Sequence, residues 1–259
     1  SPQGFFGRAC VPLVVGDKVI LMAGGKTAKG PAGLVALNLG DGKVAWQSVT
    51  DEASYAAPIL KDVGWPSVIC WMRNQLTVCD ARDGSVKFQQ PLRSRMDASV
   101  NAATPIWCGE NLLTTAGYGV GASLWKWDPA GKFTRIWQHD EDVLDCHYST
   151  PVYHDGHVYG FHGRQEFGQN LRCIRVQDGK VMWESGRLAG GTLLLVKDTL
   201  LVVTEAGELW MVDATPQKFS RRAQGQILTG GHRSHAAFSN GVLYARDSKQ
   251  VVAVDLRTE

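Results

Sequence analysis

What the chain lacks already excludes several classes of protein. No apolar run approaches the length of about 20 residues that a membrane-spanning helix needs. Lysine and arginine together number 27 and nearly balance 25 aspartates and glutamates, and the two signs are interspersed, which argues against nucleic acid as the main partner. The sequence has no glycine-rich phosphate loop and no Gly-x-Ser-x-Gly turn, which disfavours nucleotide-binding proteins and hydrolases.

The cysteines form no Cys-x-x-Cys motif, and no two of them are adjacent. The six positions are Cys10, Cys70, Cys79, Cys108, Cys146 and Cys173. Four of them fall inside apolar strand patterns, where a thiol behaves as a small buried hydrophobe. We therefore expect structural thiols, and the count leaves both a disulfide and the redox compartment open. No signal peptide is visible, because the chain opens with Ser1-Pro2-Gln3-Gly4.

A repeat organises what the chain does contain. Residues 36–46 read as a strand, a tight Gly40-Asp41-Gly42 turn and a return strand that ends in Trp46. Similar segments follow at 79–88, 127–137, 173–183 and 212–219, and a last one begins at 253. The mean period is about 43 residues, which for strands and turns predicts four-stranded blades of a β-propeller.

A second marker keeps the same period and supports the all-β propeller. It is a proline followed by two apolar residues, at Pro12, Pro58, Pro105 and Pro151. Proline has no N–H to donate, so it belongs on an edge strand, and the innermost strand of each blade is such an edge. The predicted blades cover residues 9–50, 53–92, 100–140, 147–187, 189–224 and 232–259, as one domain.

The repeat resembles that of the PQQ-like (quinoprotein-type) propeller family, whose blades end in Ala-x-Asp-x-x-x-Gly-Lys-x-x-Trp. Asn38 and Arg175 stand where that family has aspartate. The resemblance covers essentially the whole chain and implies the fold. It is less specific for function, because members include outer-membrane assembly scaffolds of the BamB type, quinone-dependent dehydrogenases and sensor ectodomains.

Two sets of repeat residues are expected to be structural. The closing aromatics should pack between neighbouring blades; they are Trp46, Phe88, Trp137 and Trp183. The polar residues before the last turn should hydrogen-bond that turn; they are Asn38, Asp80, Asp128, Asp213 and Asp255.

The last repeat lacks its outer strand, which would leave an exposed edge. Gly4-Phe5-Phe6 could close the ring of six blades. The alternative that we favour is an N-terminally shortened piece of a propeller of about eight blades, since the resemblance implies further repeats upstream that would supply this strand.

The connections predict two unlike faces. Because strands alternate in direction, the tight turns after the first and third strands of each blade share one face. The opposite face carries long polar connections, at 25–33, 47–55, 89–101, 139–148, 162–170 and 225–235. Long loops on a rigid scaffold are where binding residues usually lie.

We expect a ligand or protein partner to bind at the channel mouth on this long-loop face. The candidate residues are Asp51, Glu52, Tyr55, Arg93, Arg95, Asn101, Asp145, His147, Tyr148, Arg164, Glu166, His232 and His235. Their carboxylates, arginines and histidines could hold a polar or anionic molecule, or could pair with one another around a solvated channel. An ion pair of Arg93 and Arg95 with Asp97 or Glu52 is one such alternative. The acidic run 139–147 fits no zinc or calcium signature, so no metal is expected there.

Two functions follow from this pattern and the resemblance. The first is a non-catalytic binding or scaffold module of the bacterial cell envelope, in the periplasm, without a cofactor. The second is a PQQ-dependent alcohol or sugar dehydrogenase, for which the resemblance implies a quinone on the propeller axis and Ca²⁺. Glu52, Asn101 and Asp145 could then supply oxygens, but the chain has no adjacent cysteines and no obvious tryptophan at the channel mouth.

Overall fold

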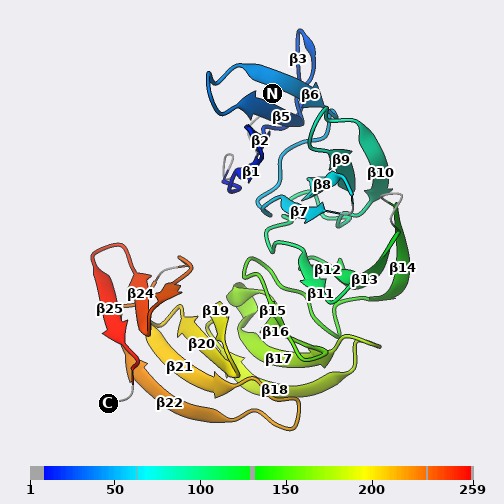
Figure 1. Cartoon of the computed structure of the whole chain (residues 1–259). Coiled ribbons are helices and arrows are strands. Elements are labelled where there is room, and N and C mark those ends of the chain that lie inside the picture. The colour runs from blue at the N-terminus through cyan, green and yellow to red at the C-terminus, as the bar shows by residue number, and fades with distance from the viewer. Residues whose placement is uncertain (1–8, 63, 129–131, 232, 258–259) are drawn as a thin grey trace.

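The computed structural model describes residues 9–62, 64–128, 132–231 and 233–257. Within these residues the chain forms five four-stranded antiparallel sheets, one three-stranded sheet and a two-stranded hairpin. Each of the six larger sheets is built from one continuous stretch of the chain. The sheets succeed each other along an arc, with the first strand of each sheet on the inner side (Figure 1). This arrangement confirms the predicted β-propeller fold.

The first sheet consists of β1 (Leu13–Val15), β2 (Lys18–Met22), β5 (Leu34–Asn38) and β6 (Val44–Ser48). The second consists of β7 (Ile59–Asp62), β8 (Pro66–Trp71), β9 (Gln75–Asp80) and β10 (Val86–Pro91). The third consists of β11 (Ile106–Cys108), β12 (Asn111–Ala116), β13 (Gly121–Asp128) and β14 (Lys132–His139). The fourth sheet consists of β15 (Val152–His154), β16 (His157–His162), β17 (Gln169–Arg175) and β18 (Val181–Leu188). The fifth consists of β19 (Gly191–Val196), β20 (Thr199–Thr204), β21 (Glu208–Asp213) and β22 (Arg221–Gln226). The sixth consists of β23 (Ala237–Ser239), β24 (Val242–Arg246) and β25 (Val251–Asp255). A small hairpin of β3 (Lys26–Thr27) and β4 (Gly30–Pro31) and a 3-10 turn, η1 (Gln165–Phe167), lie within loops.

The marker prolines lie just outside the strands that we expected to contain them. Pro12, Pro58, Pro105 and Pro151 each directly precede the first residue of an inner strand. The physical reason is the same missing N–H: the ladder of hydrogen bonds begins one residue after the proline.

The tight turns between third and fourth strands repeat one geometry. In the turns at Gly42, Gly84 and Gly179, glycine adopts φ values of 66°, 73° and 73°, a region that disfavours side chains. The glycine N–H donates back to the last residue of the third strand, as from Gly84 to the Asp80 carbonyl at 2.8 Å. The Asp80 carboxylate accepts from the N–H and Nε of Arg82, both at 2.9 Å, so it helps to hold the turn.

The closing aromatics join each sheet to the next. Trp46 Nε1 donates to the Ala81 carbonyl at 2.9 Å, and its ring packs among the core residues of the second sheet. Phe88 has no such donor and instead meets Phe133 edge to face, with ring centroids 5.8 Å apart. Burial of these rings supplies apolar stabilisation between sheets that a single sheet could not obtain alone.

The fifth and sixth sheets depart from the pattern. We expected the outer strand of the fifth sheet near Phe219, but β22 begins at Arg221, and Phe219 packs instead on Trp183 at 5.5 Å between ring centroids. The sixth sheet has β25 as its outermost strand among the described residues, as expected from the repeat. The segment Gly4-Phe5-Phe6, proposed to close the ring, lies outside the described residues.

The core consists of clusters between adjacent sheets, and its largest fully buried side chains include Trp71 and Trp125. All six cysteines are free thiols, five of them buried, and burial raises the pKa of Cys79 to about 12.

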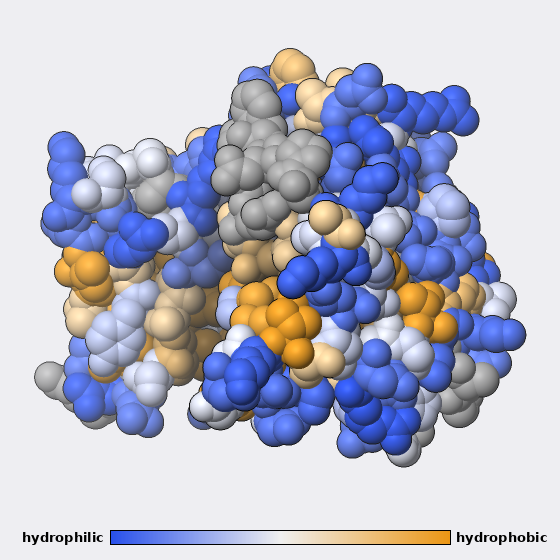
Figure 2. All heavy atoms as spheres, turned by 90° about the horizontal axis from the view of Figure 1, so that it is seen from above, coloured by the Kyte–Doolittle hydropathy of each residue, from blue (hydrophilic) through white to orange (hydrophobic). Residues whose placement is uncertain are grey.

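Along the described ranges, no helix has the length and apolarity required to cross a membrane. Figure 2 shows hydrophilic side chains over most of the face seen from above, with apolar ones gathered in small patches.

Candidate functional site

The long connections gather on one face, which we call the loop face. It consists of the loops between sheets and the loops between the second and third strands within sheets. Their hydrogen bonds place them together: the N–H groups of Tyr55 and Ala56 donate to the Asn101 carbonyl at 3.1 and 3.0 Å, and Arg73 donates to the Glu52 carbonyl at 3.1 Å. The opposite face, with the tight turns, is called the turn face.

One cavity on the loop face, which we call the loop-face groove, has a volume of about 850 Å³. It lies over the second, third and fourth sheets and is lined by Leu92, Arg93, Ser94, Arg95, Met96, Tyr118, Gly119, Val120, Gln138, Asp140, Glu141, Asp145, His162, Gly163, Arg164, Phe167 and Gly168. Four predicted site residues, Arg93, Arg95, Asp145 and Arg164, are therefore brought together here.

The arginines of the groove are held in different ways. Arg93 donates to Asn74 Oδ1 at 2.8 Å and lies 3.6 Å from Asp97, which is the ion pair considered above. Arg164 lies over the Tyr118 ring at 4.5 Å and the Phe167 ring at 5.4 Å, and pairs with Glu166 at 3.2 Å. Arg95 is exposed and has no hydrogen bond or ion pair with a described residue.

The second cavity, the axial cavity, has a volume of about 960 Å³ and lies among the inner strands. Its lining residues are Ala9, Val11, Tyr55, Ala57, Val100, Ala102, Thr104, Tyr118, His147, Tyr148, Thr150, Gln165, Glu166, Arg233 and His235. The set includes five predicted site residues, namely Tyr55, His147, Tyr148, Glu166 and His235. Threonine hydroxyls link neighbouring inner strands, since the Ala57 N–H donates to Thr104 Oγ1 at 3.1 Å and the Thr104 N–H to Thr150 Oγ1 at 3.0 Å.

Two tyrosines at this cavity make charged or polar contacts. Tyr118 Oη lies 2.8 Å from His147 Nε2, while His147 Nδ1 contacts Gln165. Tyr148 Oη donates to Glu205 at 2.6 Å, and burial, followed by this carboxylate, raises the pKa of Tyr148. These contacts immobilise the aromatic rings at the cavity wall.

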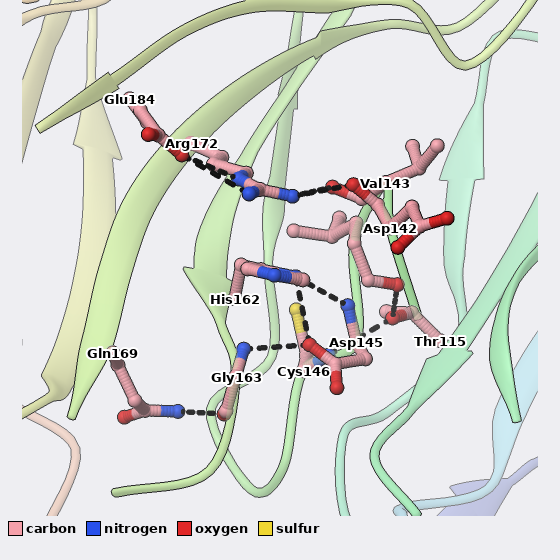
Figure 3. A network of polar contacts seen from close by, with 11 residues as sticks. Thr115, Asp142, Val143, Asp145, Cys146, His162, Gly163, Gln169, Arg172 and Glu184 are labelled. Atoms are coloured by element: carbon pink, nitrogen blue, oxygen red, sulfur yellow. Dashed lines mark hydrogen bonds and ion pairs between the residues drawn. The ribbon is translucent and has the colours of Figure 1, made fainter. Parts of the chain in front are cut away.

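A carboxylate fixes the loop between the third and fourth sheets. Asp145 Oδ1 accepts from the Gly163 N–H at 2.6 Å and lies 2.7 Å from His162 Nδ1 (Figure 3). In the same network Arg172 donates to the carbonyls of Asp142 and Val143 at 2.7 and 3.0 Å. Asp145 is 5% exposed, so its carboxylate is largely engaged within the protein although it borders the groove.

Two further predicted site residues serve the loops in a similar way. Asp51 accepts from the N–H groups of Asn74 at 3.1 Å and Glu52 at 2.8 Å, and Asn101 donates to the Met72 carbonyl at 2.8 Å. Both are buried and line neither cavity, so we assign them to loop support. Glu52 is exposed but also lines neither cavity, and His232 lies outside the described residues.

Sequence reasoning missed Tyr118, Gln165 and Glu205. Gln165 lies in the long connection 162–170, where only the charged residues were selected, and the other two were missed because loops were ranked by length. Tyr118 and Glu205 lie in short connections between second and third strands, which share the face of the long loops. A usable signal was Tyr118 between Gly117 and Gly119: it adopts a φ of 62°, and such flanking glycines often mark a constrained turn.

The family model described as "Outer membrane protein assembly factor BamB" matches residues 2–185, more than half of the chain. The chain belongs to the BamB family. A curated BamB from Yersinia pestis is 24% identical over 253 residues, which cover 88% of this chain and 60% of that protein. The chain thus spans about 60% of the length of this BamB relative.

Solved structures show the same fold. The crystal structure of BamB from Moraxella catarrhalis has a TM-score of 0.69 at 18% identity, covering 93% of this chain and 67% of that one. The quinohemoprotein alcohol dehydrogenase from Comamonas testosteroni has a TM-score of 0.66 at 11% identity, covering 92% and 51%. At these identities the likeness is one of fold.

The residues of this BamB-family chain do not fit the quinone and Ca²⁺ of the dehydrogenase alternative. Glu52, Asn101 and Asp145, the candidate calcium ligands, do not converge: none lines the axial cavity, and two of them are occupied by protein hydrogen bonds. The described lining of that cavity contains tyrosines but no tryptophan on which a quinone could stack. Among the described residues, no cluster of three or more His, Cys, Asp or Glu side chains could hold a metal.

Proposed function

We propose that this chain is a non-catalytic scaffold module for the assembly of outer membrane proteins, and that it docks a protein partner on the loop face. The observation that carries the proposal is a pair of exposed apolar side chains at the groove. Met96 and Phe167 are 50% and 65% exposed, although each lies in the lining of a polar cavity. The match to the assembly-factor family supports the same role.

The composition of the groove suits a protein interface. Arginine, methionine and aromatic residues are enriched at the centres of protein interfaces, where water is excluded around them. Arg95 is free to pair with a partner carboxylate, while Arg164 is already ordered by the rings of Tyr118 and Phe167. A side chain that is ordered before binding loses little entropy when the partner arrives.

The groove also suggests the character of the partner segment. Asp140 and Glu141 line it together with the arginines, so both signs of charge are available. We infer a segment with apolar side chains for Met96 and Phe167 and with charges of both signs beside them. We propose that this segment belongs to another component of the outer-membrane assembly machinery. In that case this chain acts in the periplasm.

The test uses cells whose outer membrane protein assembly depends on this protein. We expect Arg95→Glu combined with Phe167→Ser to lower the level of assembled outer membrane proteins while leaving the melting temperature of the purified chain unchanged. The matched control is Lys43→Glu combined with Leu39→Ser, since both residues are exposed on the turn face. Equal assembly in the two double variants would overturn the proposal. If the first variant unfolds, the single substitution Arg95→Glu decides instead, because Arg95 has no hydrogen bond or ion pair with a described residue. Unchanged assembly in that single variant would also overturn the proposal.

A further inference from the structure

The closing aromatics occupy one register position. In each of the first four sheets, an aromatic on the outer strand pairs with a third-strand residue immediately before a register shift. The pairs are Trp46 with Ala36, Phe88 with Val78, Trp137 with Leu124, and Trp183 with Cys173. The common shift shows that the aromatic belongs to the repeat, and it identifies the equivalent position elsewhere.

The three tryptophans at this position make the same kind of hydrogen bond. Trp46, Trp137 and Trp183 each donate Nε1–H to a backbone carbonyl in the following sheet, those of Ala81, Val176 and Thr215, at 2.9, 2.9 and 2.6 Å. The three accepting carbonyls lie in the connection between the third and fourth strands, one or two residues past the end of the third strand. Each of these three joints therefore provides an apolar slot with a hydrogen-bond acceptor at its end.

The fifth sheet has alanine at the same position. Ala223 pairs with Met211 immediately before the same register shift, and its side chain is exposed. The row across the fifth sheet runs Leu201, Met211, Ala223, where the fourth sheet has Tyr159, Cys173 and Trp183. A small side chain thus replaces the ring that would join the fifth sheet to the sixth.

A cavity lies at this joint. Its volume is about 350 Å³, and it is lined by Val196, Lys197, Thr199, Leu201, Met211, Phe238, Gly241 and Leu256. Leu201 and Met211 belong to the row that ends in Ala223, while Phe238, Gly241 and Leu256 come from the sixth sheet and its turns. The volume is in the range of roughly 300–1,000 Å³ that is usual for small-ligand pockets. Figure 1 shows the two sheets side by side, at the yellow-to-red end of the chain.

One lysine, Lys197, lines the slot and has no ion pair or hydrogen bond with a described residue. Arg221 and Arg222 lie on the outer strand of the same sheet beside Ala223; Arg221 stacks over Trp210 at 4.5 Å, and Arg222 pairs with Asp213 at 2.6 Å. An incoming segment with a carboxylate could therefore pair with Lys197 without breaking an ion pair between described residues.

We propose that this slot is a docking site for one tryptophan side chain, carried by an acidic extended segment of a partner protein. The tryptophan ring would occupy the space that Trp46, Trp137 and Trp183 occupy at the other joints. A carboxylate next to it in the segment would pair with Lys197. The site lies at the turn face, opposite the loop-face groove, so it does not depend on the proposed function.

The test uses a short peptide as the probe, acetyl-Asp-Trp-Asp-amide, with binding measured by titration calorimetry. Ala223→Trp should fill the slot with the chain's own indole, raise the melting temperature and weaken peptide binding at least tenfold. Ala45→Trp, at an exposed alanine of β6, is the matched control and should leave binding unchanged. Lys197→Glu should weaken this peptide several-fold more than acetyl-Ser-Trp-Ser-amide, because only the first carries charge.

Several results would overturn the proposal. They are the absence of measurable binding to the unmodified chain, equal binding by the Ala223→Trp and Ala45→Trp variants, and equal binding of acetyl-Asp-Ala-Asp-amide. The other possible occupant of the slot is a second copy of this chain, and sedimentation tests for it. If the unmodified chain self-associates, and Ala223→Trp abolishes self-association without changing peptide binding, the slot binds a second copy and the proposal is wrong. If Ala223→Trp unfolds the chain, the charge variant Lys197→Glu still decides the outcome.

Discussion

Tyr148 and Glu205, which are far apart in the sequence, meet across two neighbouring sheets with 2.6 Å between Oη and Oε1. Arg233 completes the group from the next loop, with its Nε 2.9 Å from the same carboxylate oxygen. Three loops are therefore tied together at the mouth of the axial cavity. This contact makes the loop face a rigid surface at this point, since a charge-assisted hydrogen bond is stronger than one between neutral groups.

We expect Tyr148→Phe to lower the free energy of unfolding by about 1–3 kcal/mol, because it removes a hydrogen bond to a charged group. Tyr244→Phe is the control, since Tyr244 is 44% exposed and its hydroxyl makes no hydrogen bond with a described residue. Urea unfolding of both variants measures the difference. If they are equally stable, the contact between Tyr148 and Glu205 contributes nothing to the fold.

A second prediction compares two tryptophans that are each 8% exposed. Trp46 Nε1 donates to the Ala81 carbonyl, whereas Trp127 Nε1 is buried and has no hydrogen-bond partner among the described residues. Replacement of Trp46 by Phe should therefore cost about 1 kcal/mol more than replacement of Trp127 by Phe, which removes an unsatisfied donor. Calorimetric unfolding of the two variants is the measurement. The reverse order would show that the indole hydrogen bond does not strengthen the joint.

A third prediction concerns two glycines in equivalent turns. Gly42 and Gly84 have φ values of 66° and 73°, so alanine is strained at both. Only at Gly84 would an added Cβ lie 2.5 Å from a carbon of the Trp46 ring; at Gly42 it would meet nothing within 4 Å. Gly84→Ala should thus cost about 1–3 kcal/mol more than Gly42→Ala, the range expected for overpacking. Equal losses in urea unfolding would mean that the ring moves aside freely.

A fourth prediction concerns acid stability. Arg175 and the Lys180 N–H lower the pKa of Asp178 from 3.8 to about 2, and Arg257 lowers that of Asp255 to about 2. Between about pH 2 and pH 4, the folded state therefore binds fewer protons than the unfolded state. The stabilisation is fully present above about pH 4 and is lost as the pH falls through 2.

Both carboxylates are exposed, so solvent screening keeps the effect small. We expect the urea midpoint to fall between pH 4 and pH 2, and to fall less steeply in a chain with Asp178→Asn and Asp255→Asn. Asp97→Asn is the control, because its nearest arginine nitrogen, on Arg93, is 3.6 Å away. Parallel curves for the double variant and the unmodified chain would contradict the prediction.

The repeat was predictable because it is local. A turn such as Asp83-Gly84 needs a positive φ within a few residues, and the period of a strand is likewise set by residues close in the chain. The candidate site was less predictable, because each side chain there depends on loops from two or three sheets. Asp145 and Tyr148 lie close together in one loop, yet one supports the backbone of Gly163 and the other lines a cavity.

The sequence by itself determined the blade pattern, the placement of the long loops on one face and the family. These depend on spacing and on residues close in the chain. Only the tertiary structure decided that Asn101 supports a loop while Phe167 is exposed in a groove, and that Ala223 stands where other sheets have an aromatic. The reason is physical: a hydrogen bond or a cavity between sheets depends on side chains some 40 residues apart, whose pairing follows from the curvature and twist of the whole arc.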